Sequence, residues 1–195
     1  MTMHLKTNAI CTAGLPGAGK GLFVKAADQL GIKSIIMGDV IREGAIAKYG
    51  SATPTTTGKY MLEIREAMGR DAVAKLVVDK LISSSPIDEY ILIDGVRCIE
   101  ELNYFKKTFS KVILIAVLAD LEIRFKRVIS RGRPDDIMTL SDFIARENRE
   151  LSVGVGEVIK EADYYFINNY ETEGEAIEKA KGLLLNIIKL MRYEG

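Results

Sequence analysis

The chain has 195 residues, a length that suits one domain with a substantial core, and we expect residues 1–195 to form a single domain. Lys and Arg together number 27, as do Asp and Glu, and this zero net charge argues against generic binding to nucleic acid. Because no apolar run approaches ~20 residues and no signal segment precedes the first predicted strand, we expect a soluble, cytoplasmic protein without membrane contact.

The stretch that ends at Lys20 is the most informative one. Residues 8–13 predict a buried strand, and the residues from Lys20 towards Leu30 predict a helix. The glycine-rich turn between them can point successive N–H groups inward and form a nest for phosphate oxygens, next to the positive end of the helix. Lys20 supplies a cation that reaches the outer phosphates of a nucleotide. We therefore predict a phosphate-binding loop with the residues Gly14, Leu15, Pro16, Gly17, Ala18, Gly19, Lys20, Gly21 and Leu22.

The end of this loop departs from the common pattern. Most such loops carry Ser or Thr after Gly-Lys, and that hydroxyl contacts Mg²⁺. This chain has Gly21 and Leu22 instead. We therefore expect Mg²⁺ to be held largely by substrate oxygens, water and carboxylates.

Strand and helix patterns alternate through the rest of the chain. Strands are predicted over residues 34–37, 90–93, 112–118 and 164–167. Helices are predicted to open at Gly38, to run over 59–68 and 71–82, to follow Asp120, and to begin at the capping residues Thr139 and Thr172. Residues 51–58 and 154–156 are expected to be loops. The alternation predicts an α/β protein of three layers, with helices on both faces of a central parallel sheet.

Asp94 stands where an apolar strand ends, which is the usual place for a functional residue on an open parallel sheet. A carboxylate there can hold a water of Mg²⁺ opposite the phosphate loop. The alternative interpretation is a helix N-cap, and one side chain can serve both purposes.

Arginines recur near the predicted element ends. Arg42 follows Gly38-Asp39, where a helix N-terminus favours an anion that a guanidinium can grip through two hydrogen bonds. Arg124, Arg127 and Arg131 share one face of a helix, which is either a solvated charged face or part of a binding surface. Residues 131–138 then interrupt the helix with arginines on both sides of a glycine, as a short lid over a phosphoryl group would.

Together these motifs resemble those of the P-loop nucleoside monophosphate kinases over nearly the whole chain. Gly17-Ala18-Gly19-Lys20-Gly21 and Gly38-Asp39-x-x-Arg42 are similar to the phosphate loop and the acceptor helix of adenylate kinases. Asp94-Gly95-Val96-Arg97 is similar to their Asp-Gly-x-x-Arg with one residue fewer, and Arg127-x-x-x-Arg131 followed by Arg133-x-Asp135-Asp136 matches their lid arginines. The chain most resembles an archaeal family related to adenylate kinases, and residues 162–169 resemble the ending of dephospho-coenzyme A kinases.

The resemblance implies roles for individual residues. Asp39, Arg42 and Arg97 would bind the phosphate of an acceptor, with Arg146 as a further phosphate ligand. Arg127 would lie over the base of ATP, and Arg131 and Arg133 would face the transferring phosphoryl group. It also implies an acceptor-binding helical insert at about 38–83 and the short lid at 131–138.

The expected activity is transfer of the γ-phosphoryl group of ATP, with Mg²⁺, to a small phosphorylated and nucleotide-like acceptor. The expected catalytic residues are Lys20, Asp94, Arg131 and Arg133. One alternative is an adenylate-kinase-like ATPase that acts as a switch on a protein or ribonucleoprotein partner; Leu22 and Met37, apolar where that family is polar, favour it. The other is an enzyme like dephospho-coenzyme A kinase, in which Asp39 or Asp94 would be the base for an alcohol acceptor.

Overall fold

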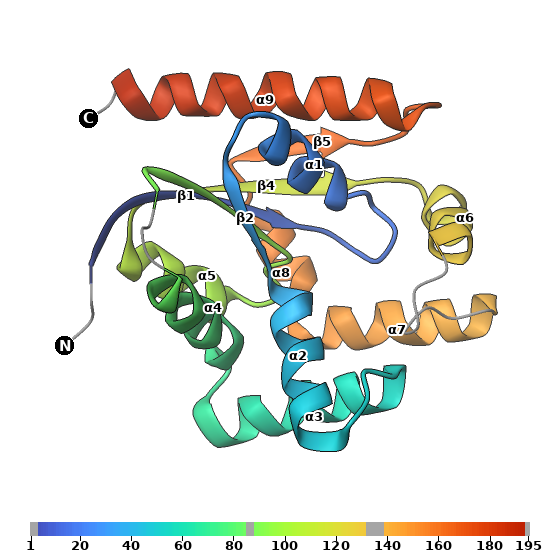
Figure 1. The fold of residues 1–195 in the computed structure, drawn as a ribbon. Helices are drawn as coiled ribbons and strands as arrows, with labels where there is room; N and C mark the ends of the chain where they lie inside the picture. Colours follow the sequence, from blue (N-terminus) through green and yellow to red (C-terminus); the bar gives the residue numbers. More distant parts are fainter. Residues whose placement is uncertain (1–3, 85–87, 132–138, 194–195) are drawn as a thin grey trace.

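The computed structural model describes residues 4–84, 88–131 and 139–193, and a parallel sheet forms its centre (Figure 1). The strands are β1 (Leu5–Ala13), β2 (Lys33–Ile36), β3 (Tyr90–Asp94), β4 (Phe109–Leu118) and β5 (Tyr164–Ile167). They are arranged in the order β2-β3-β1-β4-β5, and every neighbouring pair is parallel. β1 and β3 are buried over most of their length, as expected for apolar strands that are covered on both faces.

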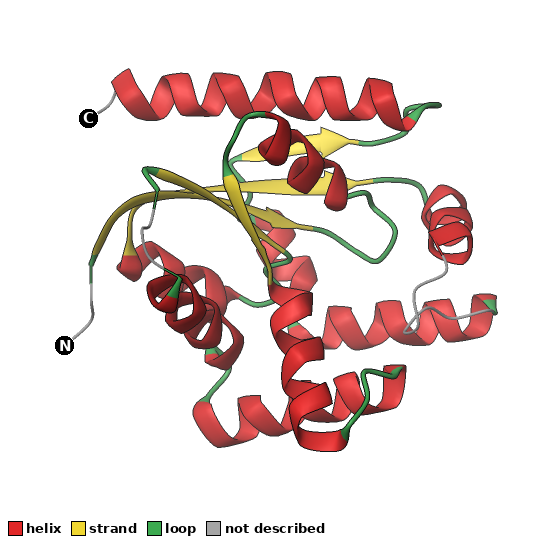
Figure 2. Cartoon of the chain, viewed as in Figure 1, coloured by secondary structure: helices red, strands yellow, loops and turns green. Residues whose placement is uncertain are grey.

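Two helices cover one face of the sheet (Figure 2). α1 (Gly21–Gln29) follows the glycine-rich turn, and α9 (Glu173–Tyr193) follows β5. Phe23 of α1, Leu184 of α9 and Ile115 of β4 are fully buried in one apolar cluster. The predicted cap of the last helix is confirmed, because the N–H of Glu175 donates to Oγ1 of Thr172 over 3.2 Å.

The opposite face is covered by α4 (Ala72–Ser83), α5 (Ile99–Thr108) and α8 (Val155–Lys160). Val77, Phe105 and Val158 are fully buried there in a second apolar cluster. Helices on both faces of a parallel sheet confirm the predicted three-layer architecture. Two local expectations differ: α5 had no predicted counterpart, and residues 154–156 are not a loop, because α8 begins at Val155.

α2 (Met37–Tyr49) and α3 (Pro54–Met68) continue from the carboxyl end of β2 and extend away from the sheet (Figure 1). The loop predicted over 51–58 is shorter than expected. The side chain of Thr53 accepts from the N–H of Thr56 in a capping box, and Pro54 occupies the first turn, so the Thr-rich segment starts the helix.

α6 (Leu121–Arg131) follows the carboxyl end of β4, and α7 (Leu140–Val153) lies below α6 in Figure 1. The predicted cap at Thr139 is confirmed, since its Oγ1 accepts from the N–H of Asp142 over 3.1 Å. Phe125 of α6 and Phe143 of α7 pack with ring centroids 5.5 Å apart. Residues 132–138 of the predicted lid lie outside the described residues.

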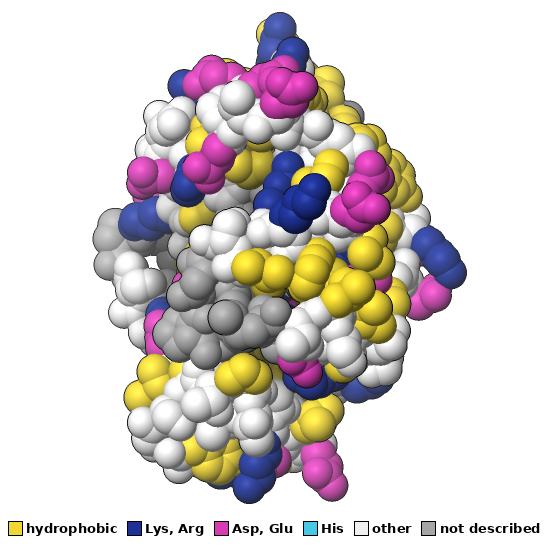
Figure 3. Space-filling view, turned by 90° about the vertical axis from the view of Figure 1, so that its right-hand side faces the viewer, with side chains coloured by type: hydrophobic (Ala, Val, Ile, Leu, Met, Phe, Trp, Pro, Cys, Tyr) yellow, Lys and Arg dark blue, Asp and Glu magenta, His cyan; other side chains and the backbone are white. Residues whose placement is uncertain are grey.

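The surface over α6 and α7 carries apolar side chains. Figure 3 views the molecule from this side and shows such side chains gathered near the middle of the face. The large apolar residues of the two helices that are more than 40% exposed are Leu121, Ile129, Leu140, Ile144 and Leu151. Within the described part of the chain, no helix is long and apolar enough to cross a membrane.

Candidate functional site

The predicted phosphate loop connects β1 to α1 and packs tightly against two other segments. Gly17 has a φ of +79°, and a Cβ built there would lie 2.2 Å from the carbonyl oxygen of Arg124. Gly19 has a φ of +98°, and its Cβ would lie 2.0 Å from Nδ2 of Asn168. Both the backbone conformation and the close approach therefore require glycine at these two positions.

Lys20 curls back over the loop that precedes it. Its Nζ donates to the carbonyl oxygens of Gly14 at 2.7 Å and Leu15 at 3.3 Å. Burial lowers the pKa of Lys20, and the nearby carboxylates of Asp94 and Glu150 oppose that effect. The side chain of Lys20 is thus half-buried in the site.

Arg124 of α6 supports the loop from outside. The side chain is buried at 5% exposure, so the solvated-face interpretation fails for this residue. Its Nη1 donates to Oε2 of Glu147 at 2.5 Å and to the carbonyl oxygen of Pro16 at 3.3 Å, and its guanidinium lies 5.6 Å from the ring centroid of Phe143. Arg124 therefore ties α6 and α7 to the phosphate loop.

Arg127 lies one turn further along α6, beside the segment that follows β5. Its Nη1 donates to the carbonyl oxygen of Asn168 at 3.1 Å, and Nδ2 of Asn168 donates to the carbonyl oxygen of Ala18 at 2.8 Å. Burial lowers the pKa of Arg127. These contacts bring Arg127 next to the loop, as a role near a bound nucleotide requires.

Asp94 ends β3 directly beside the start of the loop. Its Oδ1 accepts from Oγ1 of Thr12 in β1 at 2.5 Å, and the N–H groups of Gly95 and Val96 donate to the carbonyl oxygen of Thr12. The N-cap interpretation is wrong, because the next helix begins only at Ile99 with Cys98 as its cap residue. In the described residues no three His, Cys, Asp or Glu side chains gather as a metal site. One carboxylate oxygen of Asp94 is engaged by Thr12, and its role in holding a metal-bound water stays a prediction.

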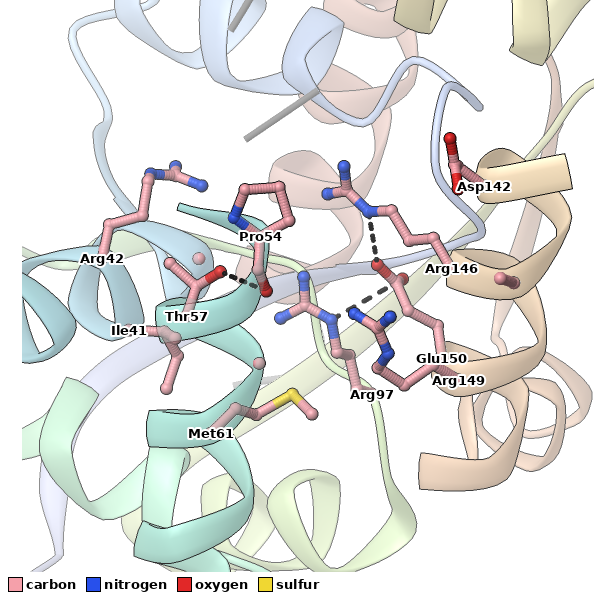
Figure 4. A pocket seen from close by; sticks show the side chains of 13 residues that line it. Ile41, Arg42, Pro54, Thr57, Met61, Arg97, Asp142, Arg146, Arg149 and Glu150 are labelled. Atoms are coloured by element: carbon pink, nitrogen blue, oxygen red, sulfur yellow. Dashed lines mark hydrogen bonds and ion pairs between the residues drawn. The ribbon is translucent and has the colours of Figure 1, made fainter. Parts of the chain in front are cut away.

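An arginine-lined pocket of about 240 Å³ lies between α2, α3, α7 and the segment after β3 (Figure 4). Arg42, Arg97, Arg146 and Arg149 supply its cationic lining, and Ile41, Pro54 and Met61 supply an apolar wall. The structure therefore brings together three arginines that the sequence assigned to an acceptor from separate motifs. In Figure 4 the side chain of Arg97 lies between those of α3 and α7.

On the α2 side the pocket is lined by Gly38, Ile41 and Arg42, whereas Asp39, which was also assigned to the acceptor, is not a lining residue. Nη2 of Arg42 donates to Oδ1 of Asp39, three residues earlier on the same helix. A Cβ at Gly38 would lie 3.3 Å from Nη1 of Arg42, so the guanidinium lies across the first turn of α2. Met37, by contrast, is fully buried in the core and cannot line the pocket.

Glu150 of α7 is a pocket residue that sequence reasoning missed. Its carboxylate oxygens lie 3.6 Å from Nε of Arg97 and 3.6 Å from Nε of Arg146. Although burial alone would raise it, the pKa of Glu150 is lowered by Arg97, Lys20 and Arg146. The pKa of Arg97 is raised, because Glu150, Glu101 and Asp94 outweigh the opposing effect of burial.

A buried ion pair also fixes the backbone at Arg97, and it too was not predicted. Oε2 of Glu101 accepts from the N–H of Arg97 at 2.8 Å. Oε1 of the same carboxylate accepts from Nη2 of Arg65 at 2.5 Å, with Glu101 fully buried and the Arg65 side chain 9% exposed. No sequence motif marks either residue; the pairing depends on α3 and α5 meeting in the fold.

Two predicted site residues cannot be placed. Arg131 is the last residue of α6, but its side chain lies outside the described residues, as does all of Arg133. Leu22 is placed, and it is buried at 8% exposure. Its Cδ1 would lie 3.1 Å from a Cβ built at Gly19, so Leu22 packs next to the loop.

Comparison with known proteins identifies the family. The family model of the AAA domain matches residues 13–142. A UPF0200 protein of Thermococcus gammatolerans is 36% identical over 191 residues, which cover 95% of this chain and 98% of the relative. The chain belongs to the UPF0200 family. A further UPF0200 protein, from Staphylothermus marinus, is 36% identical over 185 residues and 95% of both chains.

Solved structures share the fold of this UPF0200 chain. TT1252 from Thermus thermophilus is 16% identical with a TM-score of 0.64, and the likeness covers 92% of this chain and 97% of that one. A shikimate kinase from Acinetobacter baumannii, in complex with shikimate, is 18% identical with a TM-score of 0.57 and coverages of 94% and 93%. At such identities the likeness shows the fold alone, and it confirms the predicted kinase-like P-loop architecture.

Proposed function

We propose that this UPF0200 protein transfers the γ-phosphoryl group of ATP, with Mg²⁺, to a small phosphorylated acceptor of the nucleotide class. One observation carries the proposal: the phosphate loop and the arginine pocket are neighbours. The segment that carries Arg97 is hydrogen-bonded to Thr12 just before the loop, and α7, which carries Arg146, is tied to the loop through Arg124. A protein that only bound or hydrolysed ATP would need the loop, whereas a second cationic pocket beside it supports a second anionic substrate.

The donor side is proposed to use the loop amides, the N-terminus of α1 and Lys20 to bind the phosphates of ATP. Bound Mg²⁺ would supply positive charge on the phosphate oxygens, with Asp94 orienting one of its waters. Arg127 would lie near the base. Arg131 and Arg133 would neutralise the charge that develops on the phosphoryl group during transfer.

The acceptor side is proposed to use Arg42, Arg97 and Arg146 for a phosphate and the apolar wall for the rest of the molecule. A cavity of about 240 Å³ with a cationic end and an apolar wall suits a small phosphorylated compound. An acceptor that is already an anionic phosphate needs no general base, so positioning and charge neutralisation carry the catalysis.

A direct screen tests this function. Purified protein is incubated with γ-labelled ATP, Mg²⁺ and each nucleoside monophosphate or dephospho-coenzyme A, and labelled products are separated from inorganic phosphate. We expect label on one acceptor at a rate well above hydrolysis. Label found only in inorganic phosphate, whatever the acceptor, would contradict phosphotransferase activity.

A second candidate is an ATPase switch that acts on a protein partner. The exposed apolar side chains of α6 and α7, which lie on helices tied to the phosphate loop, favour it. The apolar side chains of Leu22 and Met37 do not favour a switch, because both are buried. The same screen separates the candidates, since a switch hydrolyses ATP and labels no small acceptor.

A further inference from the structure

A carboxylate stands inside the arginine pocket. Glu150 is 9% exposed, and its two oxygens face different guanidinium groups, Arg97 and Arg146, each at 3.6 Å (Figure 4). A buried carboxylate is destabilising unless cations compensate it. Because Arg97, Lys20 and Arg146 hold the pKa of Glu150 below its ordinary value, the side chain is ionised at neutral pH.

The negative charge of Glu150 opposes the binding of an anion in the pocket. A site that grips an anion gains no affinity from a carboxylate of its own, since the carboxylate competes for the same guanidinium groups. Without it, however, Arg97, Arg146 and Lys20 would repel one another in partly buried surroundings, where charge interactions are stronger than in water. Glu150 therefore stabilises the arginines while it weakens their attraction for other anions.

We propose that Glu150 is a resident counter-anion that holds Arg97 and Arg146 in place and restricts the pocket to acceptors that carry a phosphate dianion. A phosphate dianion carries more negative charge and more acceptor oxygens than one carboxylate. It can therefore bind both arginines in competition with Glu150. A monoanion such as acetate offers no more than Glu150 already supplies. This inference rests on the proposed function, because it assigns the pocket to the acceptor.

Glu150→Gln tests the competition, because it keeps the shape of the side chain and removes its charge. Glu157→Gln is the control: it removes the charge of an exposed glutamate on the next helix, which pairs with Lys160 instead of the pocket arginines. Binding of inorganic phosphate is measured by calorimetry at pH 7.5. We expect Glu150→Gln to bind phosphate at least about tenfold tighter than the wild type and Glu157→Gln to bind it as the wild type does.

Acetate tests the other half of the inference. In Glu150→Ala the side chain is removed and acetate can take its place between the arginines. We expect acetate to raise the melting temperature of Glu150→Ala and to leave the wild type unshifted. If the Glu150 variants fold only with added phosphate, the counter-anion role is supported. If they fail to fold at every anion concentration, Glu150 is a packing residue and the inference is overturned.

The same titration in Arg97→Ala keeps this inference separate from the proposed function. Suppose that Arg97→Ala binds phosphate more weakly than the wild type, but Glu150→Gln does not bind it more tightly. This result would overturn the role of Glu150 and leave the acceptor pocket in place. Phosphate binding that is the same in Arg97→Ala and the wild type would overturn the acceptor pocket itself.

Discussion

Lys20 is already engaged by the loop that it would use to bind a nucleotide. Its hydrogen bonds to the carbonyl oxygens of Gly14 and Leu15 hold the ammonium against the start of the loop. An anionic phosphate offers stronger, charge-assisted partners than two neutral carbonyls do. Lys20 is therefore positioned to exchange these contacts for phosphate oxygens with little movement of the backbone.

Lys20→Ala should weaken ATP binding at least about tenfold, because it removes a charge-assisted contact to the outer phosphates. The fold should survive, since no apolar contact of the core depends on the ammonium. Calorimetric titration with Mg·ATP measures the effect. Lys25→Ala is the control, because Lys25 is an exposed residue of α1 that pairs with Glu173. Equal affinity in the wild type and Lys20→Ala would remove the donor site.

Leu22→Thr should reduce stability and leave ATP affinity unchanged. Leu22 is buried at 8% exposure, so a hydroxyl there would lose most of its hydration. The expected loss is about 1–3 kcal/mol in the free energy of unfolding. Urea denaturation measures it. Full stability with tighter Mg²⁺-dependent binding would show instead that this position faces the phosphates.

The residues that sequence reasoning found are those that belong to motifs. The loop from Gly14 to Lys20 has a fixed spacing with a physical reason, and Arg42 and Arg97 follow strand ends. Glu150 carries no such mark, and Arg124 was marked only as one of three arginines that share a helix face. Their roles arise from contacts between α7, α6 and the loop, and one charged residue in an amphipathic helix looks like any other until its neighbours are known.

At the scale of elements, the phosphate loop depends on α6 for support. The backbone of Gly17 lies so close to α6 that a Cβ would lie 2.2 Å from the carbonyl oxygen of Arg124. Arg124 in turn pairs with Glu147 of α7. The loop, α6 and α7 therefore form one packed unit, and a change at any of these contacts should reach the nucleotide site.

Gly17→Ala should destabilise the protein and weaken ATP binding together, because the new methyl group clashes with backbone and the φ of +79° disfavours any side chain. Gly21→Ala is the matched control. It lies in the same motif at the start of α1, where a Cβ would meet nothing within 4 Å. We expect Gly21→Ala to match the wild type in melting temperature and ATP affinity. Equal melting temperatures and ATP affinities in the two variants would contradict the tight packing of Gly17 against α6.

Arg131→Ala and Arg133→Ala should each lower turnover by about tenfold or more, with a much smaller change in ATP affinity. Arginines at the predicted lid would act on the charge that develops during transfer, whereas they add little to binding in the ground state. Steady-state rates and ATP titrations, compared with exposed Lys126→Ala on α6, measure the difference. Wild-type turnover in both variants would exclude a catalytic lid.

Element prediction succeeded where local signals were strong and failed where packing decides. The caps at Thr139 and Thr172 were read correctly from side chains that bond to the next turn. The start of α3 at Pro54 was missed, because a run of threonines has low helix propensity and only the capping box overrides it. α5 was missed as well, since its few apolar residues give a short stripe.

At the scale of the whole molecule, zero net charge conceals a strong local separation. Four arginines and two carboxylates, Asp142 and Glu150, line one pocket next to the phosphate loop, so the pocket has a local excess of positive charge. The three-layer fold followed from the alternation of strands and helices, which is a property of the entire chain. The position of the arginine pocket could not follow from it, because α7 is distant in sequence from α2 and α3 and meets them only in the folded protein.

The fate of the γ-phosphoryl group tests the central claim, that a donor site and an acceptor site work side by side. With γ-labelled ATP and the acceptor found by screening, label in transferred product and in inorganic phosphate is counted for the wild type, Lys20→Ala and Arg97→Ala. We predict transfer by the wild type and neither reaction in Lys20→Ala. In Arg97→Ala we predict transfer reduced at least about tenfold with hydrolysis retained. Wild-type transfer in Arg97→Ala, or loss of both reactions in equal proportion, would contradict two adjacent sites.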